Sequence, residues 1–244
     1  MPENNKINLS IFVPVCNEEK ILFSNVTQIY NGLKKLKDKF EIVIVDDNSK
    51  DKTPLIAKKL IKNENIRYIR YKNGPSRREN LADSFKTAKG DIIIFMDVDL
   101  STPAQFLPKL IGYVKDGADI AISSRYLKGS RVKREAFRRL ISYLYNSMVR
   151  LYFGSKIRDH QNGFKAFKKG IALKIIKKMG YDKSFKRGWF WDAEFLIRAQ
   201  IDGYKIVEFP INWRYGKKST FNIRNEIRMI PYILKLKKML KNEV

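Results

Sequence analysis

Short apolar runs alternate with amphipathic segments of helical spacing through the first hundred residues, and this alternation limits the fold more than any other feature. The apolar runs, rich in β-branched residues, predict strands at 7–15, 40–45, 65–71 and 91–97. Apolar positions three and four residues apart predict helices between them, at 21–36, 54–62 and within 73–90. Strands that are apolar on both faces and separated by helices form parallel sheets covered by helices. We therefore expect an α/β fold with a mostly parallel central sheet flanked by helices.

The order of elements changes after Asp99. The predicted elements of this second half are a helix at 101–117, a strand at 118–126, a strand and a helix within 163–180, a helix at 189–203, a strand at 204–213 and a basic amphipathic helix at 222–242 interrupted by Pro231. No internal repeat, low-complexity tract or obvious linker interrupts the chain. We therefore expect one domain over 1–221, with halves 1–100 and 101–221, and a basic amphipathic C-terminal helix over 222–244.

Positive charge is the unusual feature of the composition, with 50 Lys and Arg against 25 Asp and Glu and a formal net charge of +25. It is concentrated in two segments: residues 125–169 carry 13 basic and 2 acidic side chains, and residues 217–244 carry 8 and 2. Such a field attracts polyanions, which include nucleic acids, anionic lipid headgroups and phosphorylated substrates. Charge by itself leaves these three classes of partner open.

The chain has one cysteine, Cys16, and one histidine, His160. A single cysteine excludes an internal disulfide framework and a cysteine-based zinc cage, and a single histidine excludes a multi-histidine metal site. The N-terminus is polar and shows no signal peptide. The longest apolar-looking stretch, 140–149, is ten residues long, whereas roughly 20 are needed to span a bilayer. We therefore expect a soluble or peripherally bound protein.

Polar clusters follow three of the predicted strands abruptly, at 17–19, 46–49 and 97–99. Ligands of parallel α/β sheets bind beyond the carboxyl ends of the strands, so these clusters predict a binding crevice. Asp97 and Asp99 are alternate residues at a strand end and can point the same way. Two adjacent carboxylates repel each other unless a cation joins them, and Mg²⁺ or Mn²⁺ is held by such groups together with substrate phosphates. A pair of solvated turn residues is the alternative interpretation of this motif.

Seven motifs in order along the chain resemble glycosyltransferase family 2. They are IFVPVCNEE, IVIVDDNSKDKT, DIIIFMDVDLSTP, AISSRYLKGS, DHQNGFKAF, WFWDAE and INWRYGKKST. Within that family the chain is most similar to the polyprenyl or dolichyl phosphate glycosyltransferases, and DHQNGFKAF and WFWDAE are more like the dolichyl-phosphate glucosyltransferase branch than the mannosyltransferase branch. The resemblance implies a GT-A nucleotide-diphospho-sugar transferase fold over 1–221.

The resemblance also implies a nucleotide site and a metal site. The nucleotide would contact residues of the first two strand ends, namely Pro14, Cys16, Glu18, Val45 and Asp47. Asp97 and Asp99 would bind Mg²⁺ or Mn²⁺, with Asp97 also facing the donor. Ser101 stands where a glutamine completes the ion's shell in the mannosyltransferase branch, and it is the third candidate ligand.

Two of the assigned or neighbouring residues have simpler interpretations. Cys16 replaces an aromatic residue that is usual in the family, and it also suits a small buried apolar position better than thiol chemistry. His160 lies beside Asp159 in the sequence and is better interpreted as a hydrogen-bonded histidine than as a metal ligand.

Three arginines match residues that hold phosphates or the acceptor in the mannosyltransferase branch: Arg125, Arg138 and Arg214. Ser219 matches a serine near the same site. Arginine suits this task because its planar fork binds phosphate oxygens in pairs and keeps its charge. Most basic residues are solvated surface charges, so the assignment rests on motif position and not on residue type.

The segment at about 134–153 mixes arginines with aromatic and aliphatic side chains, a composition typical of a helix lying in a membrane interface. A core-facing helix with a basic outer side is the alternative. The C-terminal segment adds the lysines Lys235, Lys237, Lys238 and Lys241. Because each such charge contributes about 1 kcal/mol near an anionic leaflet, we expect peripheral association with the cytoplasmic face of a membrane.

These expectations combine into a metal-dependent inverting transfer of glucose or mannose from a nucleotide-diphosphate sugar to polyprenyl or dolichyl phosphate. The favoured donor is UDP-glucose, followed by GDP-mannose. A family 2 enzyme acting on a sugar hydroxyl, in glycan or cell-envelope synthesis, is the alternative, and it would need Asp192 or Glu194 as a base. A nucleic-acid-binding protein is a distant third class, because the acidic strand ends would repel a polyanion and no binding signature is present.

Overall fold

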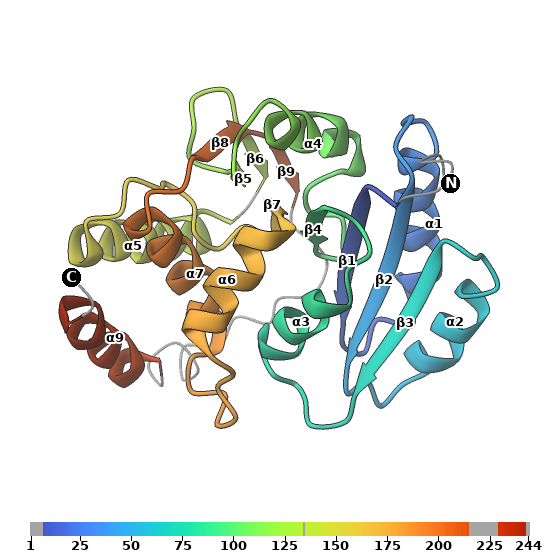
Figure 1. Cartoon of the computed structure of the whole chain (residues 1–244), viewed down its shortest axis with the longest axis horizontal. Helices are drawn as coiled ribbons and strands as arrows, with labels where there is room; N and C mark the ends of the chain where they lie inside the picture. Colours follow the sequence, from blue (N-terminus) through green and yellow to red (C-terminus); the bar gives the residue numbers. More distant parts are fainter. Residues whose placement is uncertain (1–6, 134, 215–228, 243–244) are drawn as a thin grey trace.

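The computed structural model describes residues 7–133, 135–214 and 229–242 of the chain (Figure 1). Within these residues, the main sheet has seven strands in the order β3-β2-β1-β4-β7-β5-β8. They are β1 (Leu9–Val15), β2 (Phe40–Asp47), β3 (Ile66–Tyr71), β4 (Ile92–Met96), β5 (Ile120–Ser124), β7 (Phe164–Lys168) and β8 (Ile206–Pro210). A second sheet joins β6 (Arg131–Lys133) to β9 (Asn212–Arg214).

One strand of the main sheet runs against the others. β7 is antiparallel to both of its neighbours, β4 and β5, whereas the other neighbouring pairs are parallel. The predicted mostly parallel sheet is therefore confirmed. Since two successive reversals restore direction, β5 and β8 run the same way as β4, and the carboxyl ends of these strands lie along one edge of the sheet.

Helices cover both faces of this sheet (Figure 1). They are α1 (Leu22–Leu33), α2 (Thr53–Leu60), α3 (Glu79–Ser84), α4 (Leu107–Lys115), α5 (Ala136–Phe153), α6 (Lys169–Met179), α7 (Trp191–Ile201) and α9 (Ile230–Asn242), with 3₁₀ turns η2 (Phe85–Thr87), η3 (Ala104–Phe106) and η4 (Gly188–Phe190). Alternate residues of β1 pack in opposite directions, with Leu9, Ile11 and Val13 in one core cluster and Phe12 in another. The two-sided apolar pattern of the strands thus has a layer of helices on each side.

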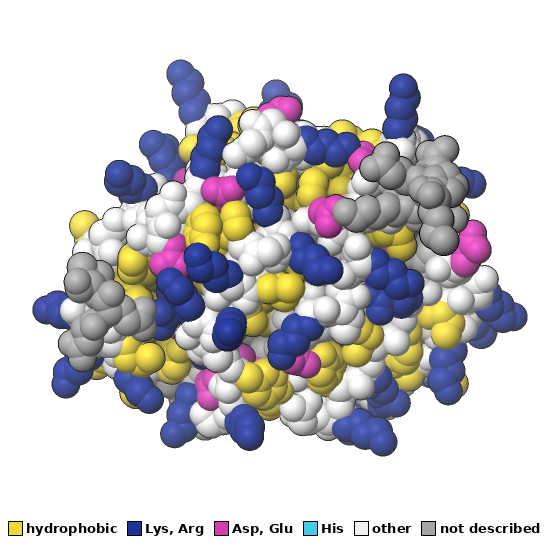
Figure 2. Space-filling view, in the orientation of Figure 1, with side chains coloured by type: hydrophobic (Ala, Val, Ile, Leu, Met, Phe, Trp, Pro, Cys, Tyr) yellow, Lys and Arg dark blue, Asp and Glu magenta, His cyan; other side chains and the backbone are white. Residues whose placement is uncertain are grey.

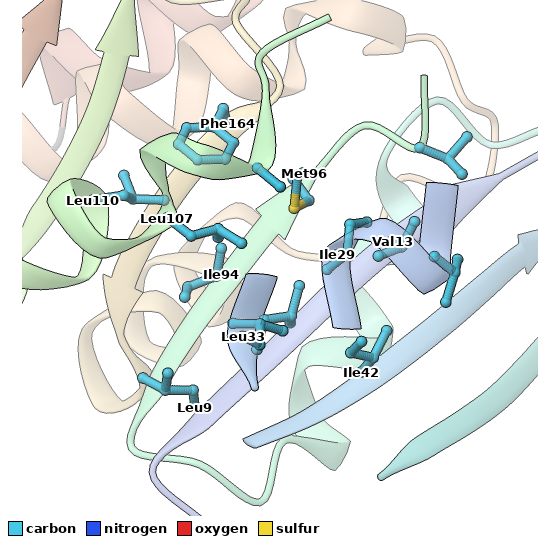
Figure 3. Close-up of a cluster of buried hydrophobic side chains, with 14 of the residues drawn as sticks. Leu9, Val13, Ile29, Leu33, Ile42, Ile94, Met96, Leu107, Leu110 and Phe164 are labelled. Carbon is cyan, nitrogen blue, oxygen red and sulfur yellow. The ribbon is translucent and has the colours of Figure 1, made fainter. Parts of the chain in front are cut away.

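The first core cluster joins the sheet to α1, α2 and α4. Figure 3 shows Ile29 and Leu33 of α1, and Leu107 of α4, gathered around Ile94 of β4. These positions follow the helical spacing that the sequence predicts, so this layer is stabilised by ordinary burial of apolar stripes.

The second core cluster joins the opposite face of the sheet to α3, α6 and α7. It is built on aromatic rings: Phe85 and Phe167 lie near Phe95 of β4, and Phe195 of α7 lies edge-on to Phe167 with 4.8 Å between ring centroids. This cluster fixes α7 against the end of β4, and the beginning of α7 therefore lies beside the carboxyl edge of the sheet.

The C-terminal helix packs on the body of the protein through a third cluster. Ile233 and Leu236 of α9 lie with Val149 of α5, Ile197 of α7 and Phe190 of η4. The sequence predicts that Pro231 interrupts this helix. α9 instead begins at Ile230, so Pro231 lies in its first turn, where a missing N–H costs nothing. The predicted residues 222–228 and 243–244 lie outside the described ranges.

The apolar run 204–213 is predicted as one strand but forms two. β8 ends at Pro210 in the main sheet, and β9 begins at Asn212 in the second sheet, where Trp213 pairs with Val132 of β6. Between them, the Ile211 carbonyl accepts a hydrogen bond from the Arg131 amide at 3.0 Å. The apolar pattern is the same on both sides of the break, so periodicity alone does not reveal the change of partner.

α5 buries few of its side chains and leaves several of its large apolar ones exposed. Its buried residues are Ser142, Asn146 and Val149, whereas Phe137 is 71% exposed and Leu151 is 87% exposed. Among the described residues, no helix combines the length and apolar character needed to cross a bilayer. Figure 2 shows Lys and Arg over the whole visible face of the molecule, with few Asp or Glu between them.

Tyr232 tests how firmly α9 is held. Its hydroxyl donates a 2.6 Å hydrogen bond to Glu194 of α7, a carboxylate that is buried. The substitution Tyr232→Phe removes this donor, so we expect the free energy of unfolding to fall by about 2 kcal/mol. Urea denaturation followed by circular dichroism measures the change. Tyr143→Phe, on the exposed side of α5, is the matched control, and an equal loss in both variants would contradict this account of α9.

Candidate active site

The three predicted polar clusters meet at the carboxyl edge of the sheet. The Asn17 amide donates to the Ser49 hydroxyl at 2.9 Å, and the Lys50 amide donates to the Asn17 side chain at 2.7 Å, so the first two loops are bonded to each other. Asn25 of α1 donates to the Val98 carbonyl at 2.9 Å and ties the third loop to the same edge. Hydrogen bonds therefore link the three strand ends at which the sequence predicts a binding crevice.

Asp97 leaves the end of β4 with its carboxylate over Gly163. Its amide donates to the Gly163 carbonyl at 3.0 Å, and a Cβ at position 163 would lie 1.9 Å from Asp97 Oδ2. Only glycine fits there, and the Asp97 side chain stays 42% exposed. Partial burial raises the pKa of Asp97, and Asp99 adds to the rise, while Arg78 opposes it.

Arg78 is the principal partner of Asp97. Its Nη1 and Nη2 both donate to Asp97 Oδ1 at 3.1 Å, and its Nε donates to Asp192 Oδ2 at 3.2 Å. The side chain is 8% exposed, with its guanidinium over the rings of Phe95 and Trp189 at 4.9 and 5.3 Å. Arg77 and Arg78 have backbone φ angles of 56° and 98°, which residues other than glycine rarely adopt. Such backbone persists where surrounding contacts hold it, commonly at functional sites.

Lys165 supplies the second buried cation. It lies on β7 with a 1% exposed side chain, and its Nζ donates to Asp192 Oδ1 at 2.8 Å and to the Asn162 carbonyl. Burial lowers the pKa of Lys165, and Asp192 opposes that change. Both oxygens of Asp192 are thus bonded to cations, one from Arg78 and one from Lys165.

The sequence analysis missed both of these cations. A signal for Lys165 exists, because a lysine between Phe164 and Ala166 in a strand covered on both faces requires a buried partner. Arg78 carries no comparable signal, since it follows a loop among many basic residues and its position depends on a backbone conformation that sequence does not reveal.

Asp99 is bound by the residue that the resemblance assigns as a further metal ligand. The Ser101 amide and hydroxyl donate to the two oxygens of Asp99 at 2.9 and 2.6 Å. The Ser101 carbonyl accepts from the amide of Arg214 on β9 at 2.9 Å. Ser101 therefore orients Asp99 and fastens its loop to the second sheet.

The donor set at this edge suits a hard divalent cation. Asp97 and Asp99 offer carboxylate oxygens on a partly open surface, which Mg²⁺ and Mn²⁺ prefer over nitrogen or sulfur. Within the described residues, no three His, Cys, Asp or Glu side chains gather closely enough to hold a metal by themselves. The two carboxylates thus fit an ion whose remaining ligands come from a bound phosphate.

The residues assigned to the nucleotide line the first two loops, with one difference. Asp47 accepts hydrogen bonds from the amide and hydroxyl of Ser76 at 2.7 and 3.1 Å and from Asn80 at 2.7 Å. Val45 belongs to the second core cluster, is 1% exposed and lies in β2 between β1 and β3, so it is buried in the sheet and does not line the loops as predicted.

The other residues assigned to the nucleotide in these loops are half-buried. Pro14 is half-buried at the end of β1, and the Glu18 amide donates to the Thr53 hydroxyl at 2.8 Å. Burial raises the pKa of the Cys16 thiol, and Asp47 adds to the rise, so the thiol is neutral.

The predicted acceptor residues occupy different environments. Arg125 forms a two-point ion pair with Asp159, with its Nε and Nη2 each at 2.7 Å from an oxygen. Arg138 lies on α5 and pairs with Glu135 at 3.1 Å. Arg214 has an exposed side chain at the end of β9, and Ser219 lies outside the described residues. A buried carboxylate for Arg125 was not anticipated from the sequence.

The alternative base residues are both engaged. Glu194 is buried between Arg187 and Arg198 with Tyr232 as a third partner, on the side of α7 that faces α9. Asp192 faces Arg78 and Lys165 as described. His160 is buried and hydrogen-bonded to Asn146 and Ser155, and burial lowers its pKa to about 4, as expected for a structural histidine.

The sequence model described as Glycosyl transferase family 2 matches residues 10–176. The chain belongs to glycosyltransferase family 2. The family predicted from the motifs is therefore confirmed. A solved complex of glucosyl-3-phosphoglycerate synthase from Mycobacterium tuberculosis with Mn²⁺, UDP and glucosyl-3-phosphoglycerate superposes with a TM-score of 0.68 at 18% identity, covering 94% of this chain and 79% of that one. This likeness confirms the GT-A fold.

Two relatives of this family 2 chain carry dolichyl-phosphate names. It is 30% identical over 244 residues to a dolichol-phosphate mannosyltransferase of Pyrococcus furiosus, with 97% of this chain and 65% of the relative covered. It is 29% identical over 235 residues to a dolichyl-phosphate beta-glucosyltransferase of Saccharomyces cerevisiae, with 86% and 68% covered. The chain spans between 33% and 68% of the length of three curated relatives that it matches.

Lys165 provides a test of the buried charge network. The substitution Lys165→Met removes one of the two cations on Asp192, so we expect a loss of about 3 kcal/mol in the free energy of unfolding. Adding Asp192→Asn removes the carboxylate charge that is left behind, and most of the loss should be recovered. Urea denaturation of the single and double variants measures both effects, and a double variant as unstable as Lys165→Met would refute the pairing.

Proposed function

We propose that this chain is a metal-dependent inverting glycosyltransferase. It transfers a hexose from a nucleotide-diphosphate sugar to polyprenyl or dolichyl phosphate at a membrane surface. The observation that carries the proposal is the pair Asp97 and Asp99 at the carboxyl edge of the sheet, where Asp97 is partly open and bonded to Arg78 and Asp99 is oriented by Ser101. Carboxylates in that position hold a diphosphate through a divalent ion.

The donor binds along the first two loops. Pro14, Cys16 and Glu18 line one side of the nucleotide, and Asp47 lines the other. UDP-glucose is the favoured donor, with GDP-mannose next. The name of the yeast relative, a dolichyl-phosphate beta-glucosyltransferase, and the UDP in the mycobacterial structure support this preference.

Asp97 and Asp99 would hold Mg²⁺ or Mn²⁺, which when bound neutralises the charge that develops on the departing diphosphate. Ser101 keeps Asp99 oriented for this task through its two hydrogen bonds. The attacking group approaches from the far side of the sugar, so the anomeric centre inverts.

The acceptor phosphate is bound by arginines. The proposed ligands of the phosphate are those that the motif positions imply: Arg138 of α5, Arg214 of β9, Arg125 directly after β5, and Ser219. A phosphate monoester is largely ionised at neutral pH and needs no general base, so alignment supplies most of the catalysis. Asp192, whose two oxygens face Arg78 and Lys165, is poorly suited to deprotonate a hydroxyl. This engagement favours a phosphate acceptor over a sugar hydroxyl.

The outward face of α5 is proposed to lie on the membrane. Phe137, Leu140, Leu144, Met148 and Leu151 recur at helical spacing and are all exposed. Arginines flank them on the same helix, at Arg138, Arg139 and Arg150. An exposed apolar stripe beside positive charge is stabilised at the interface of an anionic bilayer, where the acceptor's lipid chain is also found. The stretch thus brings the crevice to its acceptor at the cytoplasmic face.

Asp99 gives the direct test of the chemistry. The substitution Asp99→Ala removes one of the two carboxylates, and we expect transfer to fall by about 100-fold or more. The measurement is incorporation of radiolabelled glucose from UDP-glucose into dolichyl phosphate, with Mn²⁺ or Mg²⁺ and with a chelator. Asp91→Ala, exposed before the other end of β4, is the matched control. Full transfer in the presence of chelator would remove the metal role from this site.

The membrane assignment is tested by placing negative charges on the exposed apolar stripe of α5. The double substitution Leu144→Glu and Leu151→Glu places two carboxylates on the exposed face, so we expect binding to vesicles of phosphatidylcholine and phosphatidylglycerol to weaken about tenfold or more. Co-sedimentation measures it. Leu55→Glu on α2, also exposed, should bind as the natural chain does. Equal binding by all three proteins would contradict a docking role for α5.

A further inference from the structure

Arg78 is a buried cation bonded to Asp97, one of the two proposed metal ligands. We infer that Arg78 is a donor-binding residue: its terminal nitrogens hold Asp97 in the free protein and pass to the diphosphate when the nucleotide binds. The inference rests on the proposed function, since it takes the donor to be a nucleoside diphosphate. It adds a residue to which neither the sequence motifs nor the comparisons assign a role.

The contact between Arg78 and Asp97 is a loose one. Both Nη1 and Nη2 share the single oxygen Oδ1 at 3.1 Å, whereas an arginine fork is best satisfied by two oxygens in parallel. Arg125 shows that arrangement with Asp159, at 2.7 Å for each bond. A diphosphate offers paired oxygens that Asp97, as it lies here, does not. The terminal end of Arg78 therefore gains by exchanging its partner.

The rest of Arg78 is held in place. Nε stays bonded to Asp192 at 3.2 Å, and Lys165 fixes Asp192 from the other side at 2.8 Å. The guanidinium plane lies against the rings of Phe95 and Trp189, at 4.9 and 5.3 Å from their centroids. Only the Nη1 and Nη2 end is directed to the partly exposed carboxylate of Asp97, so the exchange requires a small movement of a preorganised group.

The charges around Asp97 set the direction of the effect. In the absence of the nucleotide sugar, the positive charge of Arg78 repels a divalent cation that approaches Asp97. Arg78 also occupies one of the Asp97 carboxylate oxygens that the cation would bind. The same guanidinium attracts a diphosphate. Arg78 is thus expected to weaken the binding of metal alone and to strengthen the binding of nucleotide alone.

The experiment measures these two affinities separately in the full chain. Mn²⁺ binding without nucleotide is followed by the electron paramagnetic resonance signal of free Mn²⁺, and UDP binding without metal by calorimetry. For Arg78→Met we expect Mn²⁺ to bind about fivefold or more tightly and UDP about fivefold or more weakly than in the natural chain. Arg78→Lys, which keeps the charge but loses the fork, should leave Mn²⁺ binding near its natural value and still weaken UDP.

The opposite signs separate a role in binding from a structural one. General damage weakens both ligands, and circular dichroism with thermal unfolding identifies variants that do not fold. Arg67→Met is the matched control, because Arg67 also pairs with a buried carboxylate, Glu41, but at the amino end of the sheet. It should change neither affinity.

The inference is overturned if Arg78→Met binds Mn²⁺ no more tightly, or UDP no more weakly, than the natural chain. These outcomes are distinct from failure of the proposed function. If the natural chain binds neither UDP nor GDP with Mn²⁺ present, the nucleotide-sugar donor itself is wrong. If it binds them and Arg78→Met behaves as the natural chain does, only the role of Arg78 is wrong.

Discussion

A chain of alternating acidic and basic side chains at the end of β4 holds the candidate active site together. Asp97, Arg78, Asp192 and Lys165 form a chain of ion pairs that joins β4, the loop before α3, the start of α7 and β7. Arg78, Asp192 and Lys165 are buried and are stabilised by their charged neighbours, so the four elements are fixed relative to one another. The open side of Asp97 is what this arrangement leaves for a ligand.

The topology of the sheet makes that arrangement accessible. The antiparallel β7 lies between β4 and β5, and its first residues therefore come to the same edge as the last residues of β4. Gly163, directly before β7, then lies against the Asp97 carboxylate. Lys165, the second residue of β7, is close enough to bond to Asp192. A wholly parallel sheet would bring the carboxyl end of β7 to this edge instead. The reversed direction of β7 thus places Gly163 and Lys165 beside the end of β4.

The helices α5 and α9 differ in how many of their large apolar side chains they bury. α9 buries Ile233, Leu236 and Leu240 and completes a small core with α5 and α7. α5 buries Ser142 and Asn146 and directs its large apolar side chains outward. Both helices are amphipathic and basic in sequence, so the proposed membrane surface depends on which stripe each helix presents to the protein.

The sequence by itself determined the α/β architecture, the family and the position of the acidic pair. These follow from local patterns: strand and helix periodicity, polar residues at strand ends, and motifs of fixed spacing. The tertiary structure decided the reversal of β7, the break at Pro210, the partner of Arg125 and the outward face of α5. It also decided the cationic partners of Asp97 and Asp192: Arg78 is 19 residues from Asp97 and 114 from Asp192, and Lys165 is 27 from Asp192. Pairing between distant segments depends on burial and on backbone conformation, as at Arg78 with φ 98°, and neither is encoded in local periodicity.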